Sequence, residues 1–170
     1  PIRLRMPMYP ARDQPVRAAE PGPAWDRALE AGESPHFQSP WEARAFAMVV
    51  KLAEAGSQLI VTVDCGAMAH EALAMAKDAG VDVIVVDHHK AGTALPPALA
   101  LVNPNRLDEV PEAAAHGHLA AVGVAFLLCV ALNRLLRARG LFANRDEPNL
   151  MELIDLVALG TVADVASLRG

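Results

Sequence analysis

Two short and almost wholly apolar segments constrain the fold of this chain more than any other feature. They are residues 58–63 (QLIVTV) and 81–86 (VDVIVV), and an aspartate directly follows each of them. Residues 67–79, which lie between them, favour a helix that ends at Gly80. Buried strands joined through a helix pair in parallel, in sheets that have both faces covered. The sequence therefore predicts an α/β fold with a parallel sheet.

The chain changes character near residue 40. Eight of its thirteen prolines lie in residues 1–40, where fixed φ angles and missing N–H donors oppose regular structure. Residues 39–42 (SPWE) then form a capping box, which predicts a helix that ends near residue 55. We therefore expect a poorly ordered arm over residues 1–40 and a folded domain over residues 41–170.

The second half of the chain is predicted to be mainly helical. Residues 90–118 read mostly as loop, with a short strand at residues 100–102. A long helix is expected within residues 116–139, and Asn149 is placed to cap a last helix over residues 150–159.

Composition excludes several classes of protein. The chain has 170 residues, which fits one domain, and no run of about 18 apolar residues that would predict a membrane span. Two cysteines cannot build a disulfide framework, so a cytoplasmic location is expected. A net charge of −5 argues against a general nucleic-acid coat, but not against an enzyme whose bound cations meet phosphates.

Acidic and imidazole side chains follow the two predicted strands. Asp64 comes directly after the first strand, and Asp87, His88 and His89 come directly after the second. Ligands bind at this edge of open α/β sheets, and converging carboxylates repel each other unless a cation or proton lies between them. Carboxylate together with imidazole suits Mn²⁺, Zn²⁺ or Fe²⁺. The sequence therefore predicts a metal site here, although Asp64 taken alone could equally be a helix N-cap.

Three other residues have both a structural and a functional interpretation. Asp164 on its own is typical of an ordinary loop acid. Gly123 could let a backbone or a phosphate approach closely, or it could serve close helix packing. Cys65 is expected to be a small buried packing residue, because the negative charge of Asp64 beside it disfavours a thiolate.

Five motifs together resemble the RecJ family of 5′→3′ exonucleases specific for single-stranded DNA, within the DHH phosphoesterase superfamily. The resemblance covers roughly residues 45–170, and the motifs occur in the same order and at comparable spacing as in that family. They are VDCG at 63–66, VDHH at 86–89, LVNP at 101–104, AVGVAF at 121–126 and DLVALGTVADV at 155–165.

The resemblance implies a Rossmann-like DHH phosphoesterase domain with a pair of Mn²⁺ or Mg²⁺ ions at the sheet edge. By motif match, Asp64, His88 and Asp164 would bind metal. Asp87 would orient the histidines, and His89 would contact the scissile phosphate. The reaction implied is two-metal hydrolysis of a phosphodiester.

The same resemblance implies single-stranded DNA as the partner, in DNA repair and recombination, with Gly123 as a further substrate contact. No association with a membrane is expected.

Two departures from the family pattern shape the expected activity. Residues 1–40 contain no Asp-x-Asp motif, which supplies further metal ligands in the family, and the chain ends six residues past Asp164. We therefore expect an incomplete domain with weak or no nuclease activity, and an unpaired sheet edge that invites association. The alternatives are a phosphoesterase for small substrates such as short oligonucleotides or pyrophosphate, and a non-catalytic α/β binding module.

Overall fold

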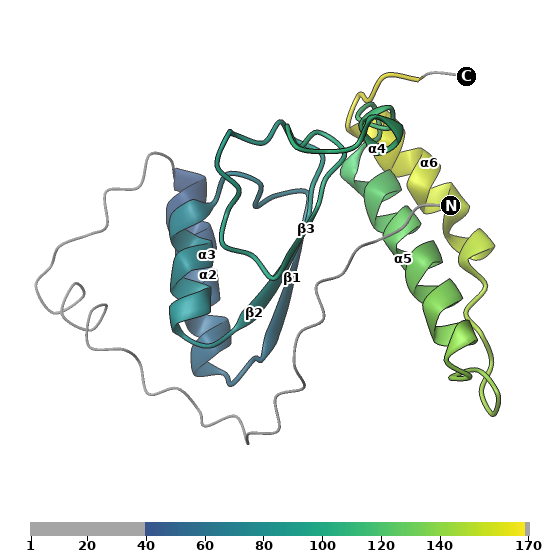
Figure 1. Cartoon of the computed structure of the whole chain (residues 1–170), viewed down its shortest axis with the longest axis horizontal. Helices are drawn as coiled ribbons and strands as arrows, with labels where there is room; N and C mark the ends of the chain where they lie inside the picture. Colours follow the sequence, from purple (N-terminus) through teal and green to yellow (C-terminus); the bar gives the residue numbers. More distant parts are fainter. Residues whose placement is uncertain (1–39, 169–170) are drawn as a thin grey trace, which may run out of the picture.

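The computed structural model describes residues 40–168, with side chains from residue 47 onward. The predicted arm over residues 1–40 and the capping residue Ser39 therefore fall outside the described residues, apart from Pro40 at the helix start. In chain order, the elements of Figure 1 are α2 (Pro40–Glu54), β1 (Leu59–Val63), α3 (His70–Asp78), β2 (Asp82–Val86), β3 (Ala100–Val102), α4 (Pro111–Ala114), α5 (Ala121–Ala138), the 3₁₀ helix η1 (Leu150–Leu153) and α6 (Ile154–Ala163).

The three strands form one parallel sheet in the order β1-β2-β3, which confirms the predicted α/β fold. In the register, Ile60 lies opposite Val83, and Val86 lies opposite Val102. The hydrogen bonding continues one step beyond the strands, because the N–H of Asp64 donates to the Val86 carbonyl and the N–H of Asp87 donates to the Val102 carbonyl. The sheet itself therefore positions both aspartates at its carboxyl edge.

The hydrophobic core lies on one face of the sheet, beneath α2 and α3 (Figure 1). Alternate residues of β1 and β2 point into it, since side chains along a strand alternate between faces. Its buried members come from α2, α3, the strands and the residue before β2: Val49, Ile60, Leu73, Ala76, Val81, Val83 and Val85.

The opposite face of the sheet is less covered than the sequence predicts. Leu59, Val61 and Val63 of β1 are each 51% exposed. Helices α5 and α6 lie on this side but tilt away from the strands, although α5 contacts β1 and β2 (Figure 1). The expectation that both faces are covered is therefore wrong for β1, whereas Val86 of β2, on the same face, is 1% exposed. Strand β1 is also an edge of the sheet within the described residues.

Three features of the helices differ from the prediction. Helix α3 begins at His70 and not near residue 67, because the N–H of Ala67 donates to the carboxylate of Asp87 and not within a helix. Residues 111–114 form α4 inside the predicted loop. The last helix runs on to Ala163, and its start is the 3₁₀ turn η1 that Asn149 caps.

Helix α5 is long and apolar enough, by length and composition alone, to cross a membrane. The prediction that the chain has no run of about 18 apolar residues still holds, because Asn133, Arg134 and Arg137 lie within this helix. The length and composition of α5 are weak evidence for a span, because the core helix of a soluble protein meets the same criterion.

Helices α5 and α6 pack closely through a glycine. A Cβ atom added at Gly160 would lie 2.8 Å from Cγ1 and 3.1 Å from Cβ of Val122. Valine is stiff at χ1, so it cannot easily rotate away from such a contact.

We predict that Gly160→Ala lowers the free energy of unfolding by about 1–2 kcal/mol through overpacking. In a Val122→Ala background the loss should be smaller, because the contact with Cγ1 at 2.8 Å disappears and only the contact with Cβ at 3.1 Å remains. Urea unfolding of the four proteins of this double-mutant cycle measures the coupling. An equal effect of Gly160→Ala in both backgrounds would contradict the packing argument.

Candidate metal centre

Asp64 ends β1 in a left-handed turn. Its φ is 65°, a conformation that only aspartate and asparagine adopt with some ease among residues that have a side chain. Gly66, two residues later, has φ 115°, and a Cβ atom there would lie 3.0 Å from side-chain atoms of Thr62 and Val85. Asp64 does not cap α3, whose N-cap is Ala69 without a side-chain bond. The N-cap interpretation is therefore wrong, and the carboxylate is free to face the sheet edge.

Asp87 is the buried polar hub of the site, with its side chain 2% exposed. Its Oδ2 accepts from the N–H of Ala67 at 2.9 Å. Its Oδ1 accepts from the N–H groups of His88 and His89 at 2.8 and 3.2 Å, and lies 2.7 Å from Nδ1 of His89. Burial on its own would raise the pKa of Asp87, but these hydrogen bonds outweigh burial and hold the pKa below its ordinary value. The carboxylate therefore stays ionised and ties two loops together.

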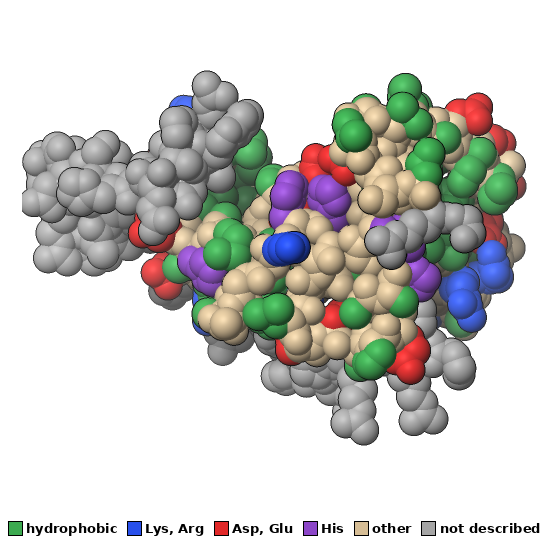
Figure 2. All heavy atoms as spheres, turned by 90° about the horizontal axis from the view of Figure 1, so that it is seen from above, with side chains coloured by type: hydrophobic (Ala, Val, Ile, Leu, Met, Phe, Trp, Pro, Cys, Tyr) green, Lys and Arg blue, Asp and Glu red, His purple; other side chains and the backbone are tan. Residues whose placement is uncertain are grey.

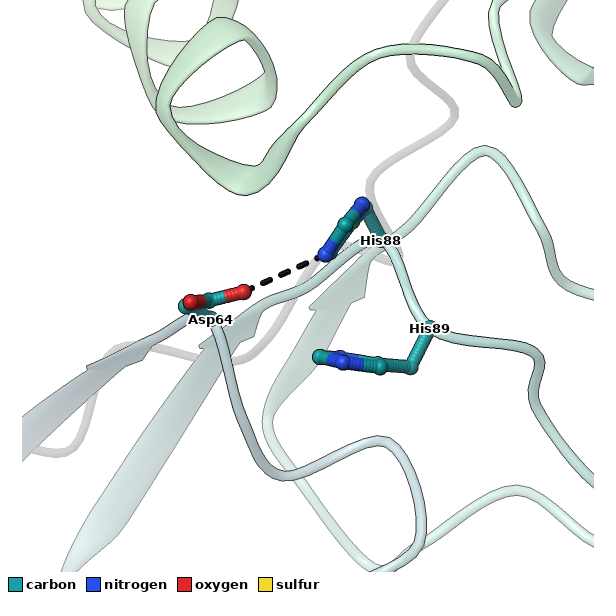
Figure 3. A group of neighbouring side chains, drawn as sticks. All are labelled: Asp64, His88 and His89. Atoms are coloured by element: carbon teal, nitrogen blue, oxygen red, sulfur yellow. Dashed lines mark ion pairs between the residues drawn. The ribbon is translucent and has the colours of Figure 1, made fainter. Parts of the chain in front are cut away.

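His88 presents a bare nitrogen to the edge of the sheet (Figure 3). Its Nδ1 lies 3.1 Å from the carbonyl oxygen of Leu119. A carbonyl oxygen can only accept a hydrogen bond, so Nδ1 carries the proton and donates. In the neutral ring Nε2 then has no proton and carries a lone pair. Nε2 is buried without a hydrogen-bond partner, 3.3 Å from Oδ1 of Asp64 and 3.7 Å from Oδ2 of Asp164. Three groups with lone pairs thus converge on one point.

Asp164 reaches this point from the far end of the described chain. It is the C-cap of α6, and its side chain is 33% exposed. The N–H of Val165 donates to the Val162 carbonyl and the N–H of Ala166 donates to the Thr161 carbonyl, which is a Schellman motif. The left-handed position of this motif normally takes glycine, yet it holds Val165 at φ 55°. Backbone strain therefore lies directly beside the carboxylate, as is common at functional sites.

His89 is oriented differently from His88. Asp87 contacts the ring of His89, whereas the ring of His88 is held by Leu119, so the orienting role expected of Asp87 reaches only one ring directly. The hydrogen bond to Asp87 raises the pKa of His89, against the opposing effect of burial. The side chain of His89 is 61% exposed, so its outer edge is open to a ligand.

Two asparagines that sequence reasoning did not assign to the site pin the histidine loop. Nδ2 of Asn103 donates to the carbonyl of His89 at 2.8 Å, and Nδ2 of Asn105 donates to the carbonyl of His88 at 2.6 Å. Asn103 is 2% exposed. The sequence feature that could have identified them is the polar Asn-Pro-Asn run directly after β3, at the same sheet edge.

The residues present fit a divalent metal ion. Asp64, His88 and His89 offer ligand atoms that all lie within 4.8 Å of one another. The lone pair of His88 Nε2, buried between two carboxylates, lacks a donor that would satisfy it. Nitrogen together with carboxylate oxygen is a donor set that suits Mn²⁺.

Two further residues lie close to the site. Gly123 is buried in the first turn of α5, and a Cβ there would make only ordinary contacts of 3.5 Å with Leu119, so tight helix packing depends on Gly160 and not on Gly123. Its role in binding substrate stays a prediction. Cys65 is exposed, which corrects the expectation that it is buried. Partial burial, followed by the charges of Asp87 and Asp64, raises the pKa of its thiol, so a thiolate is disfavoured.

Comparison with known proteins points to one family. The family described as "DHH family, N-terminal domain" matches residues 6–161. The single-stranded-DNA-specific exonuclease RecJ of Salmonella typhimurium is 54% identical over 116 residues, which is 66% of this chain and 19% of that protein. RecJ of Thermus thermophilus is 42% identical over 114 residues, 67% of this chain and 15% of that protein. The chain thus spans a fifth or less of the length of these two relatives.

Solved structures agree with this comparison. A crystal structure of exonuclease RecJ bound to manganese matches with a TM-score of 0.51 and 39% identity, over 73% of this chain and 28% of that one. RecJ from Thermus thermophilus in complex with Mn²⁺ matches with a TM-score of 0.51 and 40% identity, over 74% of this chain and 17% of that one.

We predict that Asp87→Asn destabilises the fold by about 2–4 kcal/mol, because an amide offers one acceptor atom where the carboxylate offers two. One side of the amide would then place an NH₂ group against backbone N–H donors. Urea unfolding measures the effect. Asp82→Asn, at the exposed start of β2, is the matched control and should change stability by no more than about 0.5 kcal/mol. Equal stability of the two variants would contradict the role of Asp87 as a hub.

Proposed function

The chain belongs to the DHH family, and from this premise we propose that its site hydrolyses phosphodiester bonds of single-stranded DNA with the help of divalent metal ions. One observation carries the proposal: Nε2 of His88 is buried without a partner between the carboxylates of Asp64 and Asp164. The relatives named as single-stranded-DNA-specific exonucleases and the manganese-bound RecJ structures support the substrate and the metal.

Asp64, His88 and Asp164 would hold the metal, with Mn²⁺ favoured over Mg²⁺ because one donor is an imidazole nitrogen. Bound metal would neutralise phosphate charge and lower the pKa of water. A pair of ions, as in other phosphodiester hydrolases, belongs to the same proposal. The donation from His88 Nδ1 to the Leu119 carbonyl fixes the tautomer that leaves Nε2 free to ligate.

His89 is proposed to bind the scissile phosphate. Its ring projects into solvent beside the metal ligands, and Asp87 holds Nδ1 so that the other nitrogen faces outward. The buried charge of Asp87 stabilises the protonated ring, which can then donate to a phosphate oxygen. Asp87 is accordingly a positioning residue in this proposal.

Calorimetric titration with Mn²⁺ tests the site. The wild-type chain should bind at least one Mn²⁺ ion, and His88→Gln should weaken the binding by about 10–100-fold. His118→Gln is the matched control and should leave the binding unchanged, because Nδ1 of that exposed ring lies against the carbonyl of Ala115, in its own loop. The absence of wild-type binding at millimolar Mn²⁺ would favour a non-catalytic α/β module.

The substrate is tested by comparing a long 5′-phosphorylated single strand with a dinucleotide and with pyrophosphate, each with Mn²⁺. We expect slow release of nucleotides from the single strand, abolished by Asp164→Ala. The rate should be low because the sequence contains no Asp-x-Asp motif to supply further ligands. Faster hydrolysis of the dinucleotide or of pyrophosphate would instead identify a phosphoesterase for small substrates.

A further inference from the structure

We propose that Lys90 binds a backbone phosphate of the nucleic-acid strand beside the metal site, and so helps to set the affinity for substrate. This inference rests on the proposed function. Lys90 directly follows His89, and it is exposed.

The electrostatics of the sheet edge call for such a residue. Asp64, Asp87 and Asp164 give this edge three carboxylates, which repel the phosphates of an approaching strand. Bound metal would offset this charge only at its own position. A strand that extends past the metal site needs a further cation, and a lysine ammonium is a common phosphate contact.

The other basic side chains of residues 47–168 lie elsewhere or are already paired. Lys51 and Lys77 lie in the last turns of α2 and α3, which lead into the starts of β1 and β2 at the opposite edge of the sheet. Arg106 is paired with Asp108 and also donates to the Leu101 carbonyl.

The remaining arginines lie far along α5 or beyond it: Arg134, Arg137, Arg139 and Arg145. The start of α5 adjoins His88 through Leu119, so these residues lie toward the end of the helix that is remote from the site. In Figure 2, basic side-chain atoms adjoin the histidine rings on the face seen from above.

The loop around Lys90 is fixed on both sides. Asn103 and Asn105 bind the carbonyls of His89 and His88, as described above. After Lys90, the N–H of Ala91 donates to the Asn105 carbonyl at 3.4 Å, and the N–H of Gly92 lies 3.1 Å from the sulfur of Met68. Ala91 is buried, with 8% exposure. Lys90 therefore projects an exposed side chain from an anchored backbone, which lowers the entropic cost of binding a ligand.

The test compares Lys90→Gln with the wild-type chain in binding a fluorescent, 5′-phosphorylated single-stranded oligonucleotide in the presence of Mn²⁺, by anisotropy at several salt concentrations. We expect about 3- to 10-fold weaker binding at low salt, and a slope of log affinity against log salt that is smaller by about 0.7. Lys90→Arg should restore both values. Lys77→Gln, which removes the same charge at the opposite edge, should leave both unchanged.

Each other outcome overturns a definite part of the argument. If Lys90→Gln binds the strand with the affinity and the salt slope of the wild-type chain, the role of Lys90 is overturned and the proposed function stands. A loss of Mn²⁺ affinity in Lys90→Gln, measured by calorimetry, would place its effect in the metal site and not on the strand. Failure of the wild-type chain to bind the single strand would overturn the proposed function together with this inference.

Discussion

The buried carboxylate of Asp87 is the interaction on which the rest of the site depends. Its four hydrogen bonds join the turn after β1 to the turn after β2 through Ala67, and they orient the exposed ring of His89. An ionised group at 1% exposure is tolerated only because every contact it makes is with a donor. The hydrogen bonds that connect the two turns therefore also position side chains of the candidate site.

The candidate metal centre is the place where three groups with lone pairs converge, namely Nε2 of His88 and the carboxylates of Asp64 and Asp164. Nδ1 of His88 donates a hydrogen bond to the Leu119 carbonyl, which leaves Nε2 without a partner between two carboxylates. The carboxylates of Asp64 and Asp164 reach solvent, with 58% and 33% exposure, but the buried Nε2 of His88 is costly to leave without a proton or a cation. Left-handed backbone at Asp64 and strained backbone at Val165, next to Asp164, hold both carboxylates at this point, which is consistent with a site built for a ligand.

Much of this site could be read from residue order. Carboxyl ends of parallel strands share one edge, so Asp64 and Asp87 had to lie near each other once both strands were recognised. Other contributions could not be read in this way. Asn103, Asn105 and Leu119 act through individual hydrogen bonds of amide or carbonyl groups, and such hydrogen bonds leave no periodic pattern in a sequence.

The sequence by itself determined the parallel sheet, the order of its elements and the acidic and imidazole groups at its edge, because hydrophobic periodicity and chain order are local properties. Only the tertiary structure decided which ring Asp87 orients, that Asp164 reaches His88, and that one face of β1 stays half exposed. The reach of Asp164 to His88 depends on how α5 and α6 pack together, because α6 carries Asp164 to its C-terminal end. Contacts between distant segments, such as Gly160 against Val122, determine this packing, and the local preferences of either helix do not.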